Sequence, residues 1–244
     1  SIVMSSVRFN SLLSTKTSIL LIIAHPDDEV MFFSPLLTIL LTTKKSLGIL
    51  CLSSGNADGL GEIRKKELRK AANIFNIESK NVHIVDHSKL QDGMSNDWPI
   101  DIVSDVIVDF VQKLKPDLIV SFDEYGVSFH PNHISTYLGL AKAYIRIKGE
   151  GNNNLVALKL KSKNIFRKFS GPLDLLFAYI FSEQYTWSFW SVFNGWKGIY
   201  THQSQNVWYR RLFVLMSSFS YVNSFIELSL KSSSDNIHCS NCNC

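Results

Sequence analysis

Residues Ile19-Leu-Leu-Ile-Ile-Ala-His-Pro-Asp-Asp-Glu29 decide how this 244-residue chain folds. The run Ile19–Ile23 is apolar throughout and rich in β-branched residues, which is typical of a strand buried on both faces. The strand ends in a turn that holds one imidazole and three carboxylates. Charges so close to a core require a cation or a salt network. We therefore expect a buried parallel strand with polar chemistry at its carboxyl end.

The first half of the chain alternates between apolar runs and amphipathic segments. Such an order predicts an α/β fold, with a Rossmann-like parallel sheet covered by helices on both faces. We expect an N-terminal extension (1–18), one main domain (19–224) and a flexible tail (225–244). The expected strands span 19–23, 47–52, 82–85 and 117–122, and the expected helices span 30–41, 58–76 and 100–114.

Ligands of such sheets bind beyond the carboxyl ends of the strands. The rule selects three loops in this chain, namely 25–29, 53–61 and 123–133. The middle loop is rich in glycine but lacks the Lys-Ser/Thr ending of a phosphate-binding P-loop. No Gly-x-Ser-x-Gly nucleophile elbow accompanies the serines and histidines.

The outer two loops carry a set of residues suited to a metal ion. His25 and Asp28 are three residues apart, and His133 follows the fourth expected strand. Two imidazoles and one carboxylate leave a coordination position open, as in catalytic zinc sites. Asp27 could then take a proton from a metal-bound water, and a protonated His130 could stabilise an oxyanion or protonate a leaving amine.

Simpler interpretations of the same residues remain open at this point. Asp27 or Asp28 could cap the helix that follows the first loop, because a carboxylate satisfies free backbone amides there. His130 and His133 could likewise be a helix-capping pair. The C-terminal Cys239, which belongs to a C-x-x-C-x-C ending, could bind metal, although a frayed tail is the simpler interpretation.

Four segments together resemble the PIG-L/LmbE family of zinc de-N-acetylases, over about residues 19–223. The segment 202–212 is similar to the branch that acts on N-acetylglucosaminyl-phosphatidylinositol in the second step of GPI-anchor biosynthesis. The segments are His25-Pro-Asp-Asp-Glu29, Ser54-Gly-Asn-Ala-Asp-Gly59 with Arg64 and Glu67, Gly126-Val-Ser-Phe-His-Pro-Asn-His133 and His202-Gln-Ser-Gln-Asn-Val-Trp-Tyr-Arg-Arg-Leu212.

The resemblance implies an amidohydrolase that uses Zn²⁺ or another divalent cation. It implies His25, Asp28 and His133 as metal ligands, Asp27 as the general base and His130 as the residue facing the oxyanion and the leaving group. It further implies substrate contacts for Arg64 and Asp92, which could instead be a solvated helix charge and a turn carboxylate. The alternatives are de-N-acetylation of another N-acetyl sugar conjugate and a non-catalytic glycolipid-binding protein.

The second half of the chain suits a membrane interface, which we expect within residues 148–216. A basic run at 159–168 precedes an apolar and aromatic stretch at 173–193, and residues 210–216 could continue the surface. Cations next to tryptophans are typical of the headgroup region of a bilayer. The resemblance implies the cytoplasmic face of the endoplasmic reticulum membrane, with a glycolipid substrate. A formal charge of +4 gives no support for a nucleic-acid partner.

Overall fold

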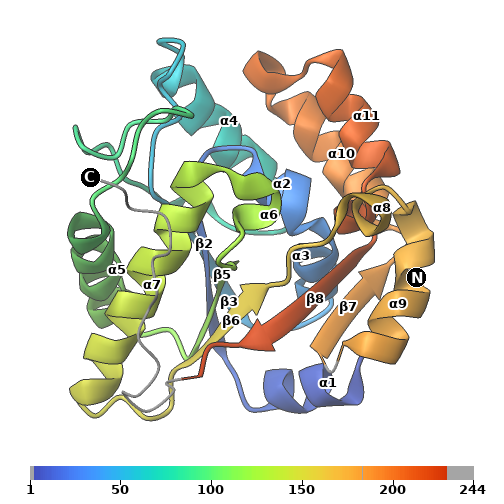
Figure 1. The fold of residues 1–244 in the computed structure, drawn as a ribbon, viewed down its shortest axis with the longest axis horizontal. Helices are drawn as coiled ribbons and strands as arrows, with labels where there is room; N and C mark the ends of the chain where they lie inside the picture. Colours follow the sequence, from blue (N-terminus) through green and yellow to red (C-terminus); the bar gives the residue numbers. More distant parts are fainter. Residues whose placement is uncertain (1–2, 183, 230–244) are drawn as a thin grey trace.

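The computed structural model describes residues 3–182 and 184–229, which build one eight-stranded sheet with helices on both faces (Figure 1). The order of the strands is β1-β7-β8-β6-β5-β2-β3-β4. Their bounds are β1 (Val3–Ser5), β2 (Ser18–Ile23), β3 (Ser46–Cys51), β4 (Val82–Ile84), β5 (Leu118–Phe122), β6 (Val156–Leu160), β7 (Gln184–Ser188) and β8 (Val222–Glu227).

Helices α3, α4 and α10 pack together on one face of the sheet, and α5 and α7 pack together on the other (Figure 1). The α-helices are α1 (Val7–Ser14), α2 (Asp28–Phe32), α3 (Ser34–Leu40), α4 (Gly61–Ile74), α5 (Ile100–Leu114), α6 (Gly126–Phe129), α7 (Pro131–Gly149), α8 (Ile165–Lys168), α9 (Asp174–Phe181), α10 (Ser191–Thr201) and α11 (Trp208–Met216). Four 3-10 turns connect them, at Ser79–Asn81, Gly171–Leu173, Gln203–Gln205 and Ser218–Ser220.

Strands β4, β3, β2, β5 and β6 are parallel, which confirms the predicted Rossmann-like core. The chain moves from β2 outward through β3 to β4, then returns through α5 to β5 on the other side of β2. The topological switch point therefore lies between β2 and β5, where ligands bind in such sheets. Strand β2 lies in the middle of the parallel part of the sheet, where both of its faces are covered. Its residues 19–23 are all apolar and buried.

The second half of the chain adds antiparallel strands, for which the sequence analysis made no prediction. Strand β8 is antiparallel to both β6 and β7, and β1 is antiparallel to β7. These strands are short and carry polar residues such as Thr186 and Asn223, so they lack the continuous apolar signal of β2. Strand β1 lies within the expected N-terminal extension, and β8 passes the expected boundary at residue 224. Residues 230–244, with the C-terminal cysteines, lie outside the described residues.

The single helix predicted over 30–41 is two helices in the structure. Helix α2 ends at Phe32, and α3 begins at Ser34 with Pro35 in its first turn. Pro35 has no N–H to donate to the carbonyl of Met31, four residues earlier, and its ring would clash with that carbonyl, so the helix cannot continue unbroken from α2. The break lets α2 turn its first residues toward the carboxyl end of β2.

Helices α5 and α7 pack so closely that Gly139 has no room for a side chain. A Cβ at Gly139 would lie 2.2 Å from Cγ1 and 2.6 Å from Cβ of Val103, whereas a Cβ at Gly149 on the same helix would meet nothing within 4 Å.

We predict that Gly139→Ala lowers the free energy of unfolding by about 1–2 kcal/mol, because overpacking outweighs the better helix propensity of alanine. The matched control Gly149→Ala should be neutral or slightly stabilising. Urea unfolding of both variants measures the difference. Equal stability of the two variants would contradict the close packing of α5 and α7.

Candidate metal centre and active site

The first and third predicted loops meet at the switch point of the sheet. His25 and Asp28 follow β2, and His133 lies in the first turn of α7, which follows β5. One ligand atom from each of the three residues lies within 4.8 Å of the other two, and all three side chains are buried. The structure thus brings together the three residues that the sequence selected from segments far apart in the chain.

Hydrogen bonds orient both imidazoles toward Asp28. Nδ1 of His133 lies 3.1 Å from the carbonyl of Gly126, so its proton is placed there and Nε2 keeps a lone pair. That buried Nε2 lies 3.2 Å from Oδ1 of Asp28 and has no hydrogen-bond partner among the described residues. Nε2 of His25 faces Asn132 at 3.0 Å, which leaves Nδ1 as a lone pair 3.7 Å from Oδ2 of Asp28.

These three residues fit a divalent cation. Two lone pairs and one carboxylate converge, and an otherwise unpartnered buried nitrogen is what a bound metal ion would satisfy. Burial alone would raise the pKa of Asp28, but His133 and His25 lower it well below its usual range. The carboxylate is therefore ionised at neutral pH, as a metal ligand requires.

Asp28 also holds the turn itself together. Its Oδ2 accepts the backbone N–H groups of Ala24 (3.1 Å) and His25 (2.8 Å). The interpretation of this turn as a helix cap is not supported, because Asp27, at the cap position of α2, makes no capping hydrogen bond with its side chain. His130 does cap α7, since its Nδ1 accepts the N–H of Asn132 at 3.3 Å.

Asp27 lies beside the three candidate ligands in a strained conformation. Its φ of 117° is in a region that residues other than glycine rarely adopt. Its backbone N–H donates to Oε2 of Glu29 at 3.0 Å, and its carboxylate pairs with Arg64 and Arg210. Strain of this kind persists only where the surroundings over-determine it, and it is concentrated at functional sites.

Arg64 is buried, and both terminal nitrogens of its guanidinium are engaged by the protein. Its guanidinium donates to the carbonyls of Gly55 (2.9 Å) and Pro26 (2.7 Å) and pairs with Asp27 (3.3 Å) and Asp92 (2.9 Å). A Cβ on Gly55 would lie 2.5 Å from the guanidinium carbon, so only glycine fits there. Arg64 thus joins the loops 25–29 and 53–61 to the loop that carries Asp92. Its contact with a substrate stays a prediction.

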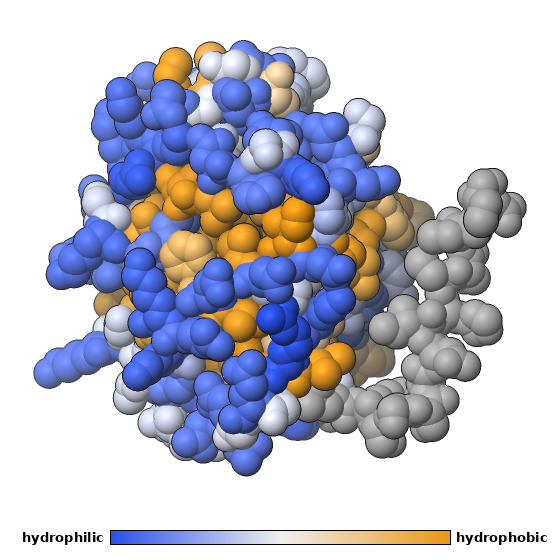
Figure 2. All heavy atoms as spheres, turned by 90° about the vertical axis from the view of Figure 1, so that its left-hand side faces the viewer, coloured by the Kyte–Doolittle hydropathy of each residue, from blue (hydrophilic) through white to orange (hydrophobic). Residues whose placement is uncertain are grey.

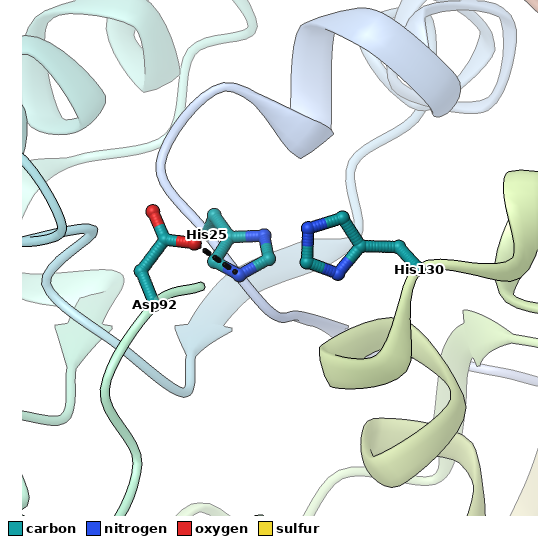
Figure 3. Close-up of side chains that lie close together, drawn as sticks. All are labelled: His25, Asp92 and His130. Carbon is teal, nitrogen blue, oxygen red and sulfur yellow. Dashed lines mark ion pairs between the residues drawn. The ribbon is translucent and has the colours of Figure 1, made fainter. Parts of the chain in front are cut away.

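Asp92 supports His25 from the loop that follows β4. Its Oδ1 lies 3.1 Å from Nε2 of His25 (Figure 3). Burial would raise the pKa of Asp92, but the hydrogen bond to His25 and the charges of His25 and Arg64 lower it to about 2. His25, Asp92 and His130 form a second group whose ligand atoms lie within 4.8 Å of one another. A substrate contact for Asp92 also stays a prediction.

His130 faces the cluster from the segment before α7 (Figure 3), with its ring centroid 4.9 Å from that of His25 and 4.7 Å from that of His133. Burial and the two neighbouring imidazoles lower the pKa of His130 to about 4. The protonated imidazole that the sequence suggested is therefore disfavoured at neutral pH. Since Nδ1 accepts the N–H of Asn132, the neutral ring carries its proton on Nε2.

Four further residues complete the site, and sequence reasoning did not include them among the candidate site residues. Oε1 of Glu29 lies 2.6 Å from Nε2 of His202, and both side chains are fully buried. Arg210 reaches Asp27, and Asn132 joins His25 to the loop of Asp92. The signal for His202 and Arg210 was present in the family-like segment 202–212, but only the folded chain shows that this segment packs against the first loop.

Two buried histidines and one buried aspartate, with a further aspartate and histidine beside them at a switch point, define a candidate metal-dependent hydrolase. The GlcNAc-PI de-N-acetylase (PIG-L) family matches residues 20–144. A probable N-acetylglucosaminyl-phosphatidylinositol de-N-acetylase of Dictyostelium discoideum is 35% identical over 87% of this chain and 94% of its own length. An N-acetylglucosaminyl-phosphatidylinositol de-N-acetylase of Bos taurus is 34% identical over 84% of this chain and 81% of its own length.

The chain therefore belongs to the GlcNAc-PI de-N-acetylase family and is an enzyme of the deacetylase class. Solved structures share its fold at low identity. An N,N'-diacetylchitobiose deacetylase of Pyrococcus horikoshii superposes with a TM-score of 0.61 and 14% identity, over 90% of this chain and 86% of that one. A 4-carboxy-2-hydroxymuconate hydratase of Pseudomonas putida superposes with a TM-score of 0.58 and 12% identity, over 90% and 99%. The fold alone thus accompanies more than one chemistry.

We predict that Glu29 and His202 are strongly coupled in stability. His202→Ala leaves the Glu29 carboxylate buried without its partner and should lower the free energy of unfolding by about 3–5 kcal/mol. Glu29→Gln in the same chain should restore part of that loss. Urea unfolding in a double-mutant cycle measures the coupling, which we expect at about 1–3 kcal/mol.

An exposed ion pair provides the control for this cycle. Lys142 pairs with Asp101 on the surface, and Lys142→Ala should change stability by less than about 1 kcal/mol. Additive effects of the Glu29 and His202 substitutions would show that the buried pair is not an energetic unit.

Proposed function

We propose that this chain hydrolyses the N-acetyl group of N-acetylglucosaminyl-phosphatidylinositol, the second step of GPI-anchor biosynthesis, with a divalent cation held by His25, Asp28 and His133. The observation that carries the proposal is the convergence of these three side chains on one point, with Asp27 beside them. Membership of the family supports the substrate, and Zn²⁺ is the first choice because two imidazoles and one carboxylate are typical of catalytic zinc.

The residues around the centre divide the reaction between them. A bound cation would polarise the acetamide carbonyl and lower the pKa of a bound water. Asp27 takes the proton of the attacking water at a carboxylate oxygen and returns it to the amine nitrogen as the C–N bond breaks. The neutral His130 donates its Nε2–H to the carbonyl oxygen as negative charge develops there. Acetate and the free amine leave.

We predict that Asp27→Asn and Asp28→Asn separate catalysis from metal binding. Asp27→Asn should reduce the rate of acetate release by about 10²–10⁴-fold, because the base is lost, while one metal ion per chain is retained. Asp28→Asn should lose both activity and metal, since a ligand is removed. Metal analysis of the purified variants and an acetate-release assay on the glycolipid measure the two effects.

The exposed variant Lys142→Ala serves as the control and should keep both properties. Full turnover in Asp27→Asn would show that another group is the base. Full metal content in Asp28→Asn would place the ion elsewhere. Wild-type acetate release that is faster on a soluble N-acetyl sugar conjugate than on the inositol lipid would contradict the proposed substrate.

We also infer that the enzyme docks on a membrane through exposed apolar residues of α8, α9, α11 and the turn before α9. Within the described part of the chain, no helix is long and apolar enough to cross a bilayer. We call this surface the docking face, and its exposed apolar side chains are Ile165, Phe166, Phe169, Leu173, Leu176, Phe177, Tyr179, Ile180, Phe181, Trp208, Tyr209, Leu212, Leu215 and Met216.

Three features of the docking face favour a bilayer as its partner. Aromatic side chains of α8 and α11 meet there, since Phe169 at the end of α8 packs against Phe213 of α11. Lys168 lies over the rings of both, where it could contact anionic headgroups. The α5 and α7 side of the molecule differs, because hydrophilic side chains surround and cross its apolar area (Figure 2). The tryptophan of β7, Trp187, is partly buried and does not belong to the face.

We predict that replacing Phe166, Leu176 and Ile180 together with Ser reduces binding to anionic liposomes at least tenfold. Each buried apolar side chain contributes about 1.5–3 kcal/mol when it is fully removed from water, so partial insertion of three suffices. Flotation with liposomes measures the effect. The matched control Leu138→Ser with Ile145→Ser removes exposed apolar residues from α7 and should bind as the wild type does. Equal binding of both variants would rule out the docking face.

Residence at the cytoplasmic face of the endoplasmic reticulum membrane extends the same proposal. The glycolipid substrate and the docking face support a membrane location, and the family resemblance supports that organelle. Cell fractionation with protease protection tests it.

A further inference from the structure

Helix α11 joins the docking face to the catalytic aspartate. Its residues Trp208, Tyr209, Leu212, Leu215 and Met216 are exposed, at the spacing of one helical face. On the inner side, Arg210 contacts Asp27, and the ring of Phe213 packs against Phe32, which lies beside His133. A lipid held at the docking face would therefore have α11 beside it as its headgroup enters the site.

Arg210 and Arg64 hold the same carboxylate in different ways. The Arg64 side chain is 5% exposed and bonds to two carbonyls and two carboxylates, so it is fixed. The Arg210 side chain is 25% exposed, and it bonds to Asp27 and to the side-chain oxygen of Gln205. Arg210 can therefore leave Asp27 without uncovering a buried charge, because Arg64 remains.

The backbone around Arg210 is anchored, so a movement of the arginine involves its side chain. The segment before α11 is tied to the core by the buried Glu29–His202 pair. It is tied to α4 by Ser204, whose N–H and hydroxyl both donate to Glu67, at 2.9 and 2.6 Å. The backbone of Arg210 is thus held between the docking face and Asp27, and its side chain is the part that can move.

We propose that Arg210 binds the phosphodiester of the glycolipid and exchanges Asp27 for it when substrate enters. This inference rests on the proposed function, in which the phosphodiester links the inositol to the lipid and so lies between the acetamide and the bilayer. A guanidinium binds a phosphate through two parallel N–H bonds and keeps its charge at every physiological pH. In the free chain, the guanidinium of Arg210 binds the carboxylate of Asp27 where it would bind the phosphate. Arg210 is then a residue that determines substrate specificity.

Two water-soluble substrates test the proposal. One is N-acetylglucosaminyl-inositol with a glyceryl phosphodiester, and the other is the same compound without phosphate. Arg210→Gln should raise KM for the first at least tenfold and change KM for the second less than twofold. For Arg210→Lys, the KM for the phosphodiester should lie between those of the wild type and Arg210→Gln, because lysine keeps the charge but cannot donate two parallel N–H bonds. The matched control Arg211→Gln removes a neighbouring guanidinium that lies over Tyr200 and should behave as the wild type does.

Equal losses on both substrates would overturn the proposal, since Arg210 would then serve only Asp27, and so would an unchanged KM on the phosphodiester. Calorimetry with the deacetylated phosphodiester product provides a readout that needs no turnover. Its affinity should fall at least tenfold in Arg210→Gln, and inorganic phosphate alone should bind far more weakly. Phosphate that binds as tightly as the product would indicate a general anion site and overturn the specificity.

The two proposals can fail separately. A wild type that binds the product through Arg210 but releases no acetate would refute the proposed function and leave the phosphodiester contact standing. Acetate release without dependence on Arg210 would do the reverse.

Discussion

The carboxylate of Asp28 is the group on which the rest of the site depends. One of its oxygens accepts the N–H groups of Ala24 and His25 and so fixes the turn at the end of β2. The other faces the free nitrogen of His133, which belongs to the opposite side of the switch point. Because these groups all contact one ionised carboxylate, that carboxylate positions the strand ends and the two imidazoles together. The same carboxylate thus fixes the backbone turn and positions the candidate metal ligands.

Further charged residues, which come from distant parts of the chain, surround Asp28. Arg64 ties Asp27 to Asp92, and Asp92 in turn holds the imidazole of His25. Buried charges of this kind are tolerable only when each has a partner, which explains why acids and bases alternate around the centre. The second half of the molecule supplies the last of them through His202 and Arg210. Helix α10, which ends next to His202 and packs against α3 and α4, holds this part of the chain in place.

Sequence reasoning found the parts of the molecule whose signal is local. The apolar run of β2, the amphipathic period of α5, which spans the predicted residues 100–114, and the charged turn could all be recognised from neighbouring residues. Strands β7 and β8 could not, because polar residues such as Thr186 and Asn223 are typical of loops, although the fold buries them here. The lowered pKa of His130 depends on its burial and on His25 from another segment as well as on the nearby His133. The links of Glu29 and Arg210 join residues far apart in the chain. Such pairings between distant residues form only in the folded chain and cannot be recognised from neighbouring residues in the sequence.

The Glu29–His202 pair has a consequence for the maturation of the enzyme. The three candidate ligands are all synthesised before the chain reaches residue 134, yet the partner of Glu29 and the second arginine of Asp27 emerge some 70 residues later. An incomplete chain would hold Glu29 in this turn without its imidazole partner. Contacts between segments so distant in sequence form late, because their loop-closure entropy is large. The active site would thus be completed in one of the final steps of folding, so the enzyme would become active only once the whole chain has folded.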